Sequence, residues 1–321
     1  MSNRLAIVVP CYNEEEVLKD SANQLSELLG KMIQDKTVDS DSYILFVNDG
    51  SKDATWNIIS SLVDEKPLFR GVKLAGNVGH QNALLAGLMT AKEDADMLIS
   101  IDADLQDDIA VIPEMVEKYY NGSDIVYGVR NNRDTDTWFK RVSAEMFYKI
   151  MHLLGVKTIS NHADFRLMSK RAVEQLSHYE ERNMFLRGVV PLIGYKTDCV
   201  YYKRKEREAG ESKYPLKKML SFAWDGITSF SIKPITLICG LGVFLLFISV
   251  VSIIYFVVGY FAGNVVEGWV SLMVSIWLIG GIQLLAIGII GQYIGKIFME
   301  TKRRPRYNVE EYLSHTFDNN K

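Results

Sequence analysis

The sequence predicts an α/β fold with a mainly parallel, doubly wound sheet, followed by an amphipathic helix and two membrane-spanning helices. Short apolar segments rich in β-branched residues alternate with segments of helical periodicity, as in sheets whose strands are joined by crossover helices. Two later stretches, 235–261 and 269–294, contain no Asp, Glu, Lys or Arg. Each exceeds the roughly 20 apolar residues that cross a bilayer.

The expected strands lie in the first half of the chain. They cover residues 5–10, 43–47, 71–74, 98–101 and 124–128. Helical periodicity follows the first three of these strands, and Pro113 marks the start of a further helix, because proline is favoured in the first helical turn. A short strand is also expected around residues 162–169.

Two carboxylates, Asp102 and Asp104, follow the fourth expected strand directly. On an extended backbone, residues i and i+2 point to the same side. Such a pair suits Mg²⁺ or Mn²⁺, which take oxygen ligands from one or two carboxylates and from substrate phosphates. The alternative is a solvated acidic turn.

Polar residues also follow the first and second strands. In a parallel sheet the carboxyl ends of the strands form one rim, where ligands bind. We therefore expect Asn13, Glu14, Asp49, Asp102 and Asp104 to gather there, which favours the metal interpretation.

Several function classes are disfavoured. No Gly-x-Gly-x-x-Gly motif follows the first strand, which argues against a nicotinamide enzyme, although the turns at 50–51 and 76–79 could hold phosphate. The net charge of −3 argues against general nucleic-acid binding. The three cysteines form neither a disulfide framework nor a zinc site, and His80 is interpreted as a packing or surface residue.

Basic side chains after the fifth strand suit a diphosphate, because guanidinium binds phosphate oxygens in a bidentate manner. Arg130 leads this group, and a solvated basic loop is the alternative. Asp164 and Arg166 lie on one side of the short strand, either as functional residues or as a structural ion pair. The charged segment 203–214 has the composition of a mobile lid that closes over phosphate.

The charges around the two apolar stretches predict their orientation. The connector 262–268 has one acidic and no basic residue, whereas several lysines and arginines follow the second stretch. By the positive-inside rule the catalytic domain and both termini are cytoplasmic. Residues 214–233 form an interfacial amphipathic helix or, alternatively, a core helix. The expected parts are a cytoplasmic domain over 1–213, this helix over 214–233, a transmembrane hairpin over 234–296 and a basic cytoplasmic tail over 297–321.

Six motifs together resemble those of the family-2 glycosyltransferases with a GT-A fold. They lie at residues 9–15, 47–53, 77–79, 102–107, 164–168 and 210–214. More narrowly, they resemble those of the polyprenyl-phosphate glycosyltransferases, namely the bactoprenol glucosyltransferases and dolichol-phosphate mannose synthase. With the paired spans included, the resemblance covers nearly the whole chain.

The resemblance implies a role for each matching residue. Asp104 and Gln106 would hold Mg²⁺ or Mn²⁺, and Asp164, Arg166 and Asp102 would form the catalytic group. The expected donor-binding residues are Pro10, Tyr12, Glu14, Asp49, Ser51, Asp102, Arg130, Arg207, Ser212 and Lys213.

The resemblance also implies the substrates. A hexose from a nucleotide sugar, with UDP-glucose or UDP-N-acetylglucosamine favoured, would pass with inversion to undecaprenyl phosphate at the inner membrane. Because a phosphate acceptor with a second pKa of about 6 is already ionised at neutral pH, we expect Asp164 to orient Arg166 or the sugar rather than to act mainly as a base. We expect a homo-oligomer formed through the transmembrane helices. The alternatives are a processive polysaccharide synthase and a non-catalytic anchor or flippase component.

Overall fold

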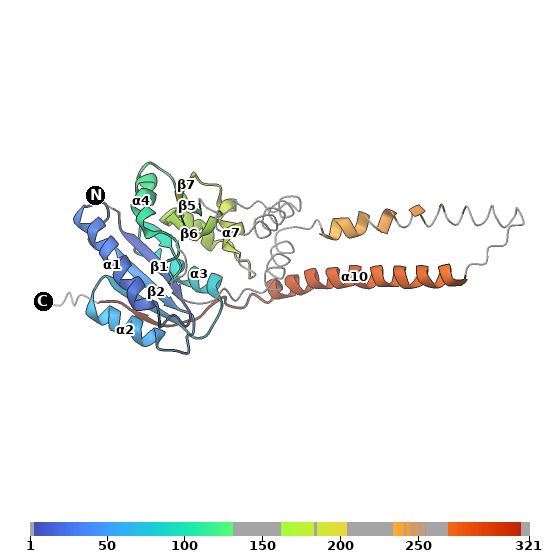
Figure 1. Cartoon of the computed structure of the whole chain (residues 1–321), viewed down its shortest axis with the longest axis horizontal. Helices are drawn as coiled ribbons and strands as arrows, with labels where there is room; N and C mark the ends of the chain where they lie inside the picture. Colours follow the sequence, from blue (N-terminus) through green and yellow to red (C-terminus); the bar gives the residue numbers. More distant parts are fainter. Residues whose placement is uncertain are drawn as a thin grey trace, which may run out of the picture. The chain divides into compact units, whose positions relative to one another are not determined.

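The computed structural model describes residues 3–130, 162–182, 185–203 and 269–315, together with parts of 234–254 (Figure 1). The chain divides into two compact units. The first, here the sheet unit, comprises Met1–Tyr148, Lys157–Lys213 and Arg304–Lys321, and the second, the apolar unit, comprises Lys149–Val156 and Tyr214–Arg303.

The sheet unit is built on one eight-stranded sheet with the order β7-β5-β6-β4-β1-β2-β3-β8. The strands are β1 (Leu5–Cys11), β2 (Tyr43–Asn48), β3 (Phe69–Leu74), β4 (Met97–Ser100), β5 (Ile125–Arg130), β6 (His162–Ser169), β7 (Thr197–Tyr202) and β8 (Val309–Leu313). Strands β3, β2, β1 and β4 are parallel, as are β5 and β7, whereas β6 and β8 pair antiparallel to their neighbours. The predicted mostly parallel α/β sheet is therefore confirmed.

The helices connect these strands as the periodicity predicts. The longer helices of the sheet unit are α1 (Leu18–Gln34), α2 (Thr55–Glu65), α3 (His80–Ala91), α4 (Ile112–Tyr120) and α6 (Lys170–Ser177). The described part of the unit also contains three short helices, η1 (Ile109–Val111), α7 (Leu186–Val189) and η2 (Val190–Ile193). Pro113 lies in the first turn of α4, as expected.

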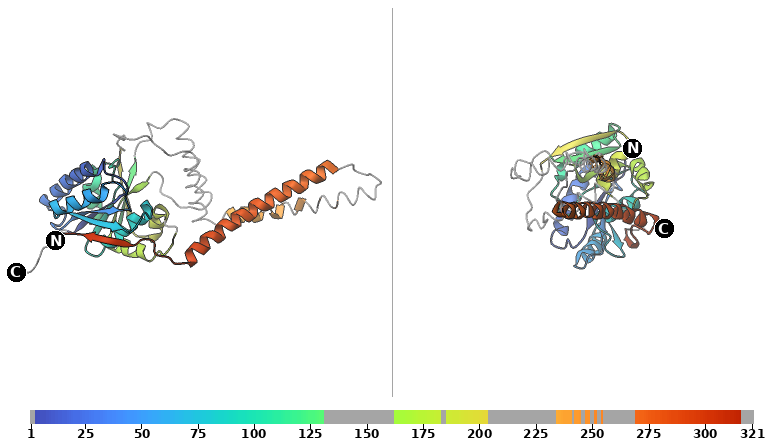
Figure 2. Two further views of the ribbon diagram at one scale, coloured as in Figure 1. Left: turned by 90° about the horizontal axis from the view of Figure 1, so that it is seen from below. Right: turned by 90° about the vertical axis from the view of Figure 1, so that its right-hand side faces the viewer.

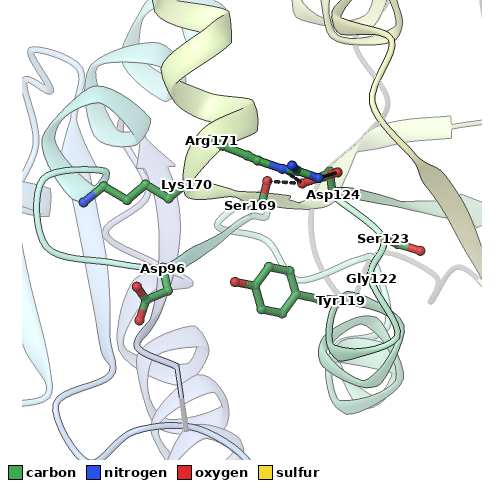
Figure 3. Close-up of a pocket in the computed structure, with 8 residues that line it drawn as sticks. All are labelled: Asp96, Tyr119, Gly122, Ser123, Asp124, Ser169, Lys170 and Arg171. Atoms are coloured by element: carbon green, nitrogen blue, oxygen red, sulfur yellow. Dashed lines mark hydrogen bonds and ion pairs between the residues drawn. The ribbon is translucent and has the colours of Figure 1, made fainter. Parts of the chain in front are cut away.

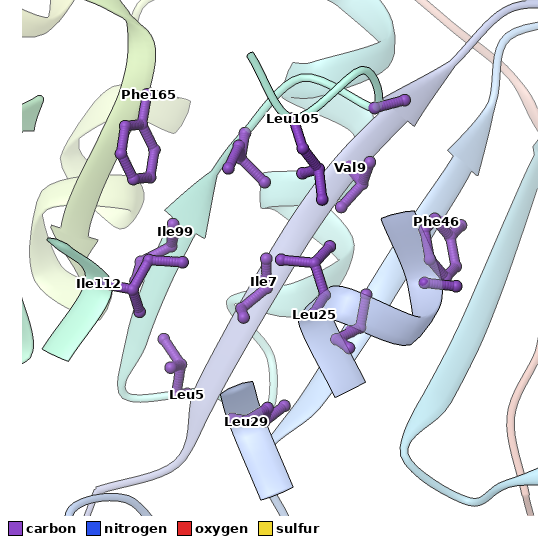
Figure 4. Packing of buried hydrophobic residues seen from close by; sticks show 14 of the residues in the cluster. Leu5, Ile7, Val9, Leu25, Leu29, Phe46, Ile99, Leu105, Ile112 and Phe165 are labelled. Atoms are coloured by element: carbon purple, nitrogen blue, oxygen red, sulfur yellow. The ribbon is translucent and has the colours of Figure 1, made fainter. Parts of the chain in front are cut away.

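The hydrophobic core lies between the sheet and its helices. Leu5, Ile7 and Val9 alternate along β1 and contact a buried cluster that includes Leu25 of α1 and Ile112 of α4 (Figure 4). The opposite face of the sheet is covered by α3. There Gly87 is required, because a Cβ atom at this position would lie 2.4 Å from Cγ1 of Val8 and 2.7 Å from Cγ2 of Val47. Helix α3 thus contacts the sheet closely, and its first turn lies at the rim.

The C-terminal segment adds a strand that the sequence analysis did not predict. Strand β8 pairs antiparallel with β3 at the edge of the sheet, where Figure 2 shows it in red. Tyr312 accepts a hydrogen bond from Arg70 at 3.3 Å, and Nζ of Lys73 lies 3.1 Å from the Glu310 carboxylate. The chain therefore leaves the sheet unit after Lys213 and returns to it at Arg304.

Helix α10 (Trp269–Thr301) dominates the described part of the apolar unit. Its segment Ile279–Thr301 is long and apolar enough to cross a membrane, and it is the one such helix found among the described residues. Of the other expected span, 235–261, the described part includes a shorter apolar helix, Pro234–Phe244. The expected amphipathic helix at 214–233 lies outside the described residues.

Candidate active site

The turns after β1 and β2 are joined by hydrogen bonds. The backbone N–H of Asn13 donates to Oγ of Ser51 at 3.0 Å, and the N–H of Lys52 donates to Oδ1 of Asn13 at 2.9 Å. Asn13 adopts a left-handed conformation with φ of 55°, which asparagine tolerates better than most residues. These bonds fix one side of the rim.

The residues expected to hold the nucleoside begin on this side. Pro10 is buried in β1, whereas Tyr12 is 43% exposed, so its ring is available to a ligand. Glu14 is half-buried, and its backbone N–H donates to Oγ1 of Thr55 at 2.9 Å. The structure thus brings Tyr12, Glu14 and Ser51 together in the turns that follow the strand of Pro10, and the contact of these four residues with a nucleoside remains a prediction.

Asp49 is buried and binds the turn that precedes α3. Its Oδ1 accepts from the N–H of Val78 at 2.7 Å, and its Oδ2 accepts from the N–H of Gly79 at 3.0 Å. Burial raises the pKa of this carboxyl, although both N–H groups act in the opposite direction. Asp49 therefore connects the β2 turn with the start of α3, and its expected part in binding the donor remains a prediction.

The two expected metal ligands are adjacent after β4. Asp104 is exposed and Gln106 is buried, and Nε2 of Gln106 donates to Oδ2 of Asp104 at 2.8 Å. Between them Leu105 has a φ of 42°, which a non-glycine residue seldom adopts. The described residues contain no group of three or more His, Cys, Asp or Glu side chains able to hold a metal.

This donor set fits Mg²⁺ or Mn²⁺ bound through few protein oxygens. A carboxylate and an amide oxygen are hard ligands, and Mg²⁺ sites commonly combine one or two carboxylates with substrate phosphates. Rotation of the Gln106 amide would direct its oxygen, instead of its nitrogen, toward a cation beside Asp104.

Asp164 lies in β6 at the centre of the site. Nη2 of Arg166 donates to its Oδ1 at 2.7 Å, and Arg187 donates from Nε to Oδ1 at 3.2 Å and from Nη2 to Oδ2 at 3.0 Å. Gln81, in the first turn of α3, donates to Oδ2 at 3.2 Å. Burial acts to raise the pKa of Asp164, but hydrogen bonding from His80 and the charges of Arg187 and Arg166 outweigh it and hold this pKa well below its usual range. Asp164 is therefore a firmly ionised acceptor.

His80 connects Asp164 with the carboxylate at the end of β4. Its Nε2 lies 3.4 Å from Oδ1 of Asp102 and 3.7 Å from Oδ2 of Asp164. Burial lowers the pKa of His80, yet the two carboxylates prevail and raise it. Burial raises the pKa of Asp102, with neighbouring carboxylates adding to this effect. His80 is exposed, as one of the two expected alternatives has it, and the structure adds that its ring lies beside two carboxylates of the site.

Arg130 is held by a buried carboxylate on the other side of the site. Its Nε and Nη2 lie 3.1 and 2.9 Å from Oδ1 of Asp107, which also accepts from the Tyr202 hydroxyl at 2.7 Å. Burial lowers the pKa of Arg130, whereas the charge of Asp107 raises it, and the net direction is upward. The structure thus fixes one edge of Arg130 and leaves its side chain partly exposed.

The predicted site and the observed site differ in their residues. Arg207, Ser212 and Lys213 lie outside the described residues. Four residues lie at the site without having been predicted as functional from the sequence, namely Gln81, Arg187, Asp107 and Tyr202. His80 and Gln81 could have been found, because they follow the turn after the third expected strand and so must lie at the rim.

A hollow lies near the amino ends of β4 and β5, and Asp96, Asp124 and Arg171 are among the residues that line it (Figure 3). Its volume is about 350 Å³. Here Arg171 forms an ion pair with Asp124, which also accepts from the Ser169 hydroxyl at 2.8 Å. The charges of Arg171 and Asp124 neutralise each other, and this hollow is not the candidate site.

Comparison with known families and proteins identifies the family of this chain. Residues 6–177 match the model of "Glycosyl transferase family 2". The chain is 56% identical to "Uncharacterized glycosyltransferase YkoT" of Bacillus subtilis (strain 168), covering 95% of this chain and 91% of the relative. It is 41% identical to "Bactoprenol glucosyl transferase" of Shigella phage SfV, covering 96% and 98%.

Among solved structures, the chain is similar to a mannosyltransferase from Pyrobaculum calidifontis. The TM-score is 0.46 at 17% identity, over 66% of this chain and 59% of that one. The match to the family model and the two full-length relatives together show that the chain belongs to glycosyltransferase family 2.

Proposed function

We propose that this protein transfers a hexose from a nucleotide sugar to undecaprenyl phosphate. The observation that carries this proposal is the 41% identity, over 96% of the chain, to a bactoprenol glucosyl transferase. The rim of the sheet supports this proposal, because the rim combines exposed carboxylates with arginines that suit a diphosphate. UDP-glucose or UDP-N-acetylglucosamine is the favoured donor, and the lipid-linked sugar would serve cell-surface glycan modification.

Different residues of the rim would bind different parts of the substrates. Tyr12, Glu14 and Ser51 would hold the nucleoside beside the loop that Asp49 stabilises. Arg130 would approach the diphosphate, and the segment that contains Arg207, Ser212 and Lys213 would close over both substrates. A divalent ion on Asp104 and Gln106 would neutralise the charge that develops on the leaving diphosphate.

Asp164 would orient groups rather than remove a proton. Its oxygens already accept hydrogen bonds from Arg166, Arg187 and Gln81, and its low pKa makes it a weak base. The acceptor phosphate needs no base, because it is ionised at neutral pH. Inversion by direct displacement would then depend on positioning two anions at the sugar carbon.

The apolar unit would anchor the enzyme in the membrane. We propose two spans, over 235–261 and 269–294, with the catalytic domain and both termini in the cytoplasm of the cell and with oligomerisation through the spans. Helix α10 supports one span by length and composition. The positive charges that follow it support the cytoplasmic side.

A membrane assay tests this function. Membranes that contain the full-length protein are incubated with labelled nucleotide sugars and undecaprenyl phosphate, with and without EDTA, and the lipid product is followed. A single lipid-linked sugar that EDTA abolishes, and that added Mg²⁺ or Mn²⁺ restores, is the expected result. A growing polymer would instead favour a processive synthase, and full activity in EDTA would refute the role of Asp104 and Gln106.

A further inference from the structure

We propose that Arg187 binds a substrate phosphate at the active site, a role that rests on the proposed function. Its guanidinium is held along one edge by Asp164, through Nε at 3.2 Å and Nη2 at 3.0 Å. These contacts leave Nη1, with two N–H groups, for another acceptor. The side chain is 41% exposed, so the outer edge is accessible.

A structural ion pair does not require this arginine. Arg166 is buried, contacts Asp164 at 2.7 Å and supplies the counter-charge that the buried carboxylate needs. A second, half-exposed arginine contributes little to stability by pairing alone. Its presence on a carboxylate that is already neutralised leaves positive charge directed at the rim.

Arg130 is held in the same way on the other side of the site. It contacts the buried Asp107 through Nε and Nη2, and its side chain is 28% exposed. Burial lowers the pKa of Arg187, whereas the charge and hydrogen bonds of Asp164 raise it, and the net direction is upward. Arg187 therefore stays charged, and its guanidinium can bind a phosphate oxygen in the same way as that of Arg130.

The bound phosphate could come from the nucleotide sugar or from the lipid acceptor. Both present the same oxyanions to a guanidinium. Two binding measurements on the full-length protein in detergent distinguish them, one with UDP and one with undecaprenyl phosphate, with the neutral alcohol undecaprenol as the reference for the second. The variants are Arg187→Gln and Arg187→Lys.

Arg171→Gln is the matched control, because Arg171 also pairs with a buried aspartate but lies at the hollow near the amino ends of β4 and β5. We expect Arg187→Gln to weaken the binding of one phosphate ligand at least tenfold, Arg187→Lys to restore part of it, and Arg171→Gln to leave it unchanged. Weaker binding of UDP would assign the donor phosphate, and weaker binding of undecaprenyl phosphate alone would assign the acceptor.

Unchanged binding of both ligands in Arg187→Gln, in a protein with wild-type melting temperature, would overturn the inference. Unfolding is controlled by Arg187→Lys, which keeps the charge near Asp164. Binding that depends on Arg187 in a protein that forms no lipid-linked sugar would support the inference and refute the proposed function. Normal sugar transfer by a protein whose ligand binding does not depend on Arg187 would support the proposed function and refute the inference.

Discussion

Arg166 and Asp164 form an ion pair in the interior of the protein, with Nη2 of Arg166 2.7 Å from Oδ1 of Asp164 and side-chain exposures of 2% and 6%. Both residues lie in β6, two positions apart on the same side of the strand. Arg166 also donates to the carbonyl oxygen of Leu186 at 3.4 Å, beside Arg187. The pair therefore connects the strand with the helix that supplies Arg187.

Removing the charge of Asp164 should destabilise the protein. In Asp164→Asn the buried guanidinium of Arg166 loses its counter-charge, and breaking such a pair costs about 3–5 kcal/mol. Urea unfolding measures this loss. Asp124→Asn is the control, because the arginine that it leaves, Arg171, is 66% exposed and can be solvated. An equal loss in both variants would contradict this explanation.

Variants of Arg166 and Asp164 show whether Asp164 orients other groups or acts as a general base. We expect Arg166→Ala to abolish sugar transfer, whereas Asp164→Asn retains part of the turnover at a pH where it is folded. The pH profile of the wild-type enzyme should show no titration of Asp164 above pH 5, because its pKa is held well below the usual range. Transfer that survives in Arg166→Ala but not in Asp164→Asn would instead identify Asp164 as the base.

His80 should make stability depend on pH near neutrality. Burial lowers its pKa, but Asp164 and Asp102 raise it above the unfolded value of about 6.5. A group with a raised folded pKa stabilises fully below its unfolded pKa, and this stabilisation is lost as the pH rises through the folded pKa. The difference in urea midpoint between wild type and His80→Gln should therefore be larger at pH 6 than at pH 8.5. The same trend in His178→Gln would show that the effect is not specific to His80.

Two neighbouring glycines test the contact between the β2 turn and the turn before α3. Gly50 has a φ of 64°, and a Cβ atom there would lie 2.5 Å from the backbone nitrogen of Asn77. Gly50→Ala should cost about 1–3 kcal/mol through strain and overpacking, and it should weaken UDP binding. Gly76→Ala, where a Cβ atom meets nothing within 4 Å, should change both quantities little. Urea unfolding measures the stability of the two variants, and calorimetry measures their affinity for UDP. Equal effects of Gly50→Ala and Gly76→Ala would show that the close contact at Gly50 is not what supports UDP binding.

Strand β8 should stabilise the sheet unit although it follows α10 in sequence. Ending the chain after Arg303 removes the antiparallel pairing with β3 and the contacts of Tyr312 and Glu310. We expect faster proteolysis around β3 and a lower urea midpoint than in a chain that ends after His315, which keeps β8. Identical behaviour of the two truncations would show that β8 is dispensable.

The sequence predicted those parts of the fold that have a local signal. The core strands β1, β2, β4 and β5 are apolar runs that end at polar turns, and their order with the helices was sufficient to predict the parallel sheet. Strand β8 has no such signal, because four of its five residues are exposed and it is defined by its pairing with β3. Strand β7 alternates only weakly between exposed and buried residues.

In the site, too, the residues with a local sequence signal were predicted, and those placed only by tertiary structure were not. Carboxylates after the strands were predictable, because the ends of parallel strands meet at one rim. Arg187 was not, because it lies in a four-residue helix without periodicity, and only tertiary structure brings it to Asp164. Asp49 was predicted at the rim, but its bonds to Val78 and Gly79 depend on how two turns approach each other.

The most direct test of the central claim is mass spectrometry of the products that the purified full-length protein forms from a nucleotide sugar and undecaprenyl phosphate. The account predicts undecaprenyl phosphate that is heavier by one sugar residue, with the nucleoside diphosphate released. A lipid that gains a sugar phosphate with release of the nucleoside monophosphate, or no lipid product with any nucleotide sugar, would contradict it.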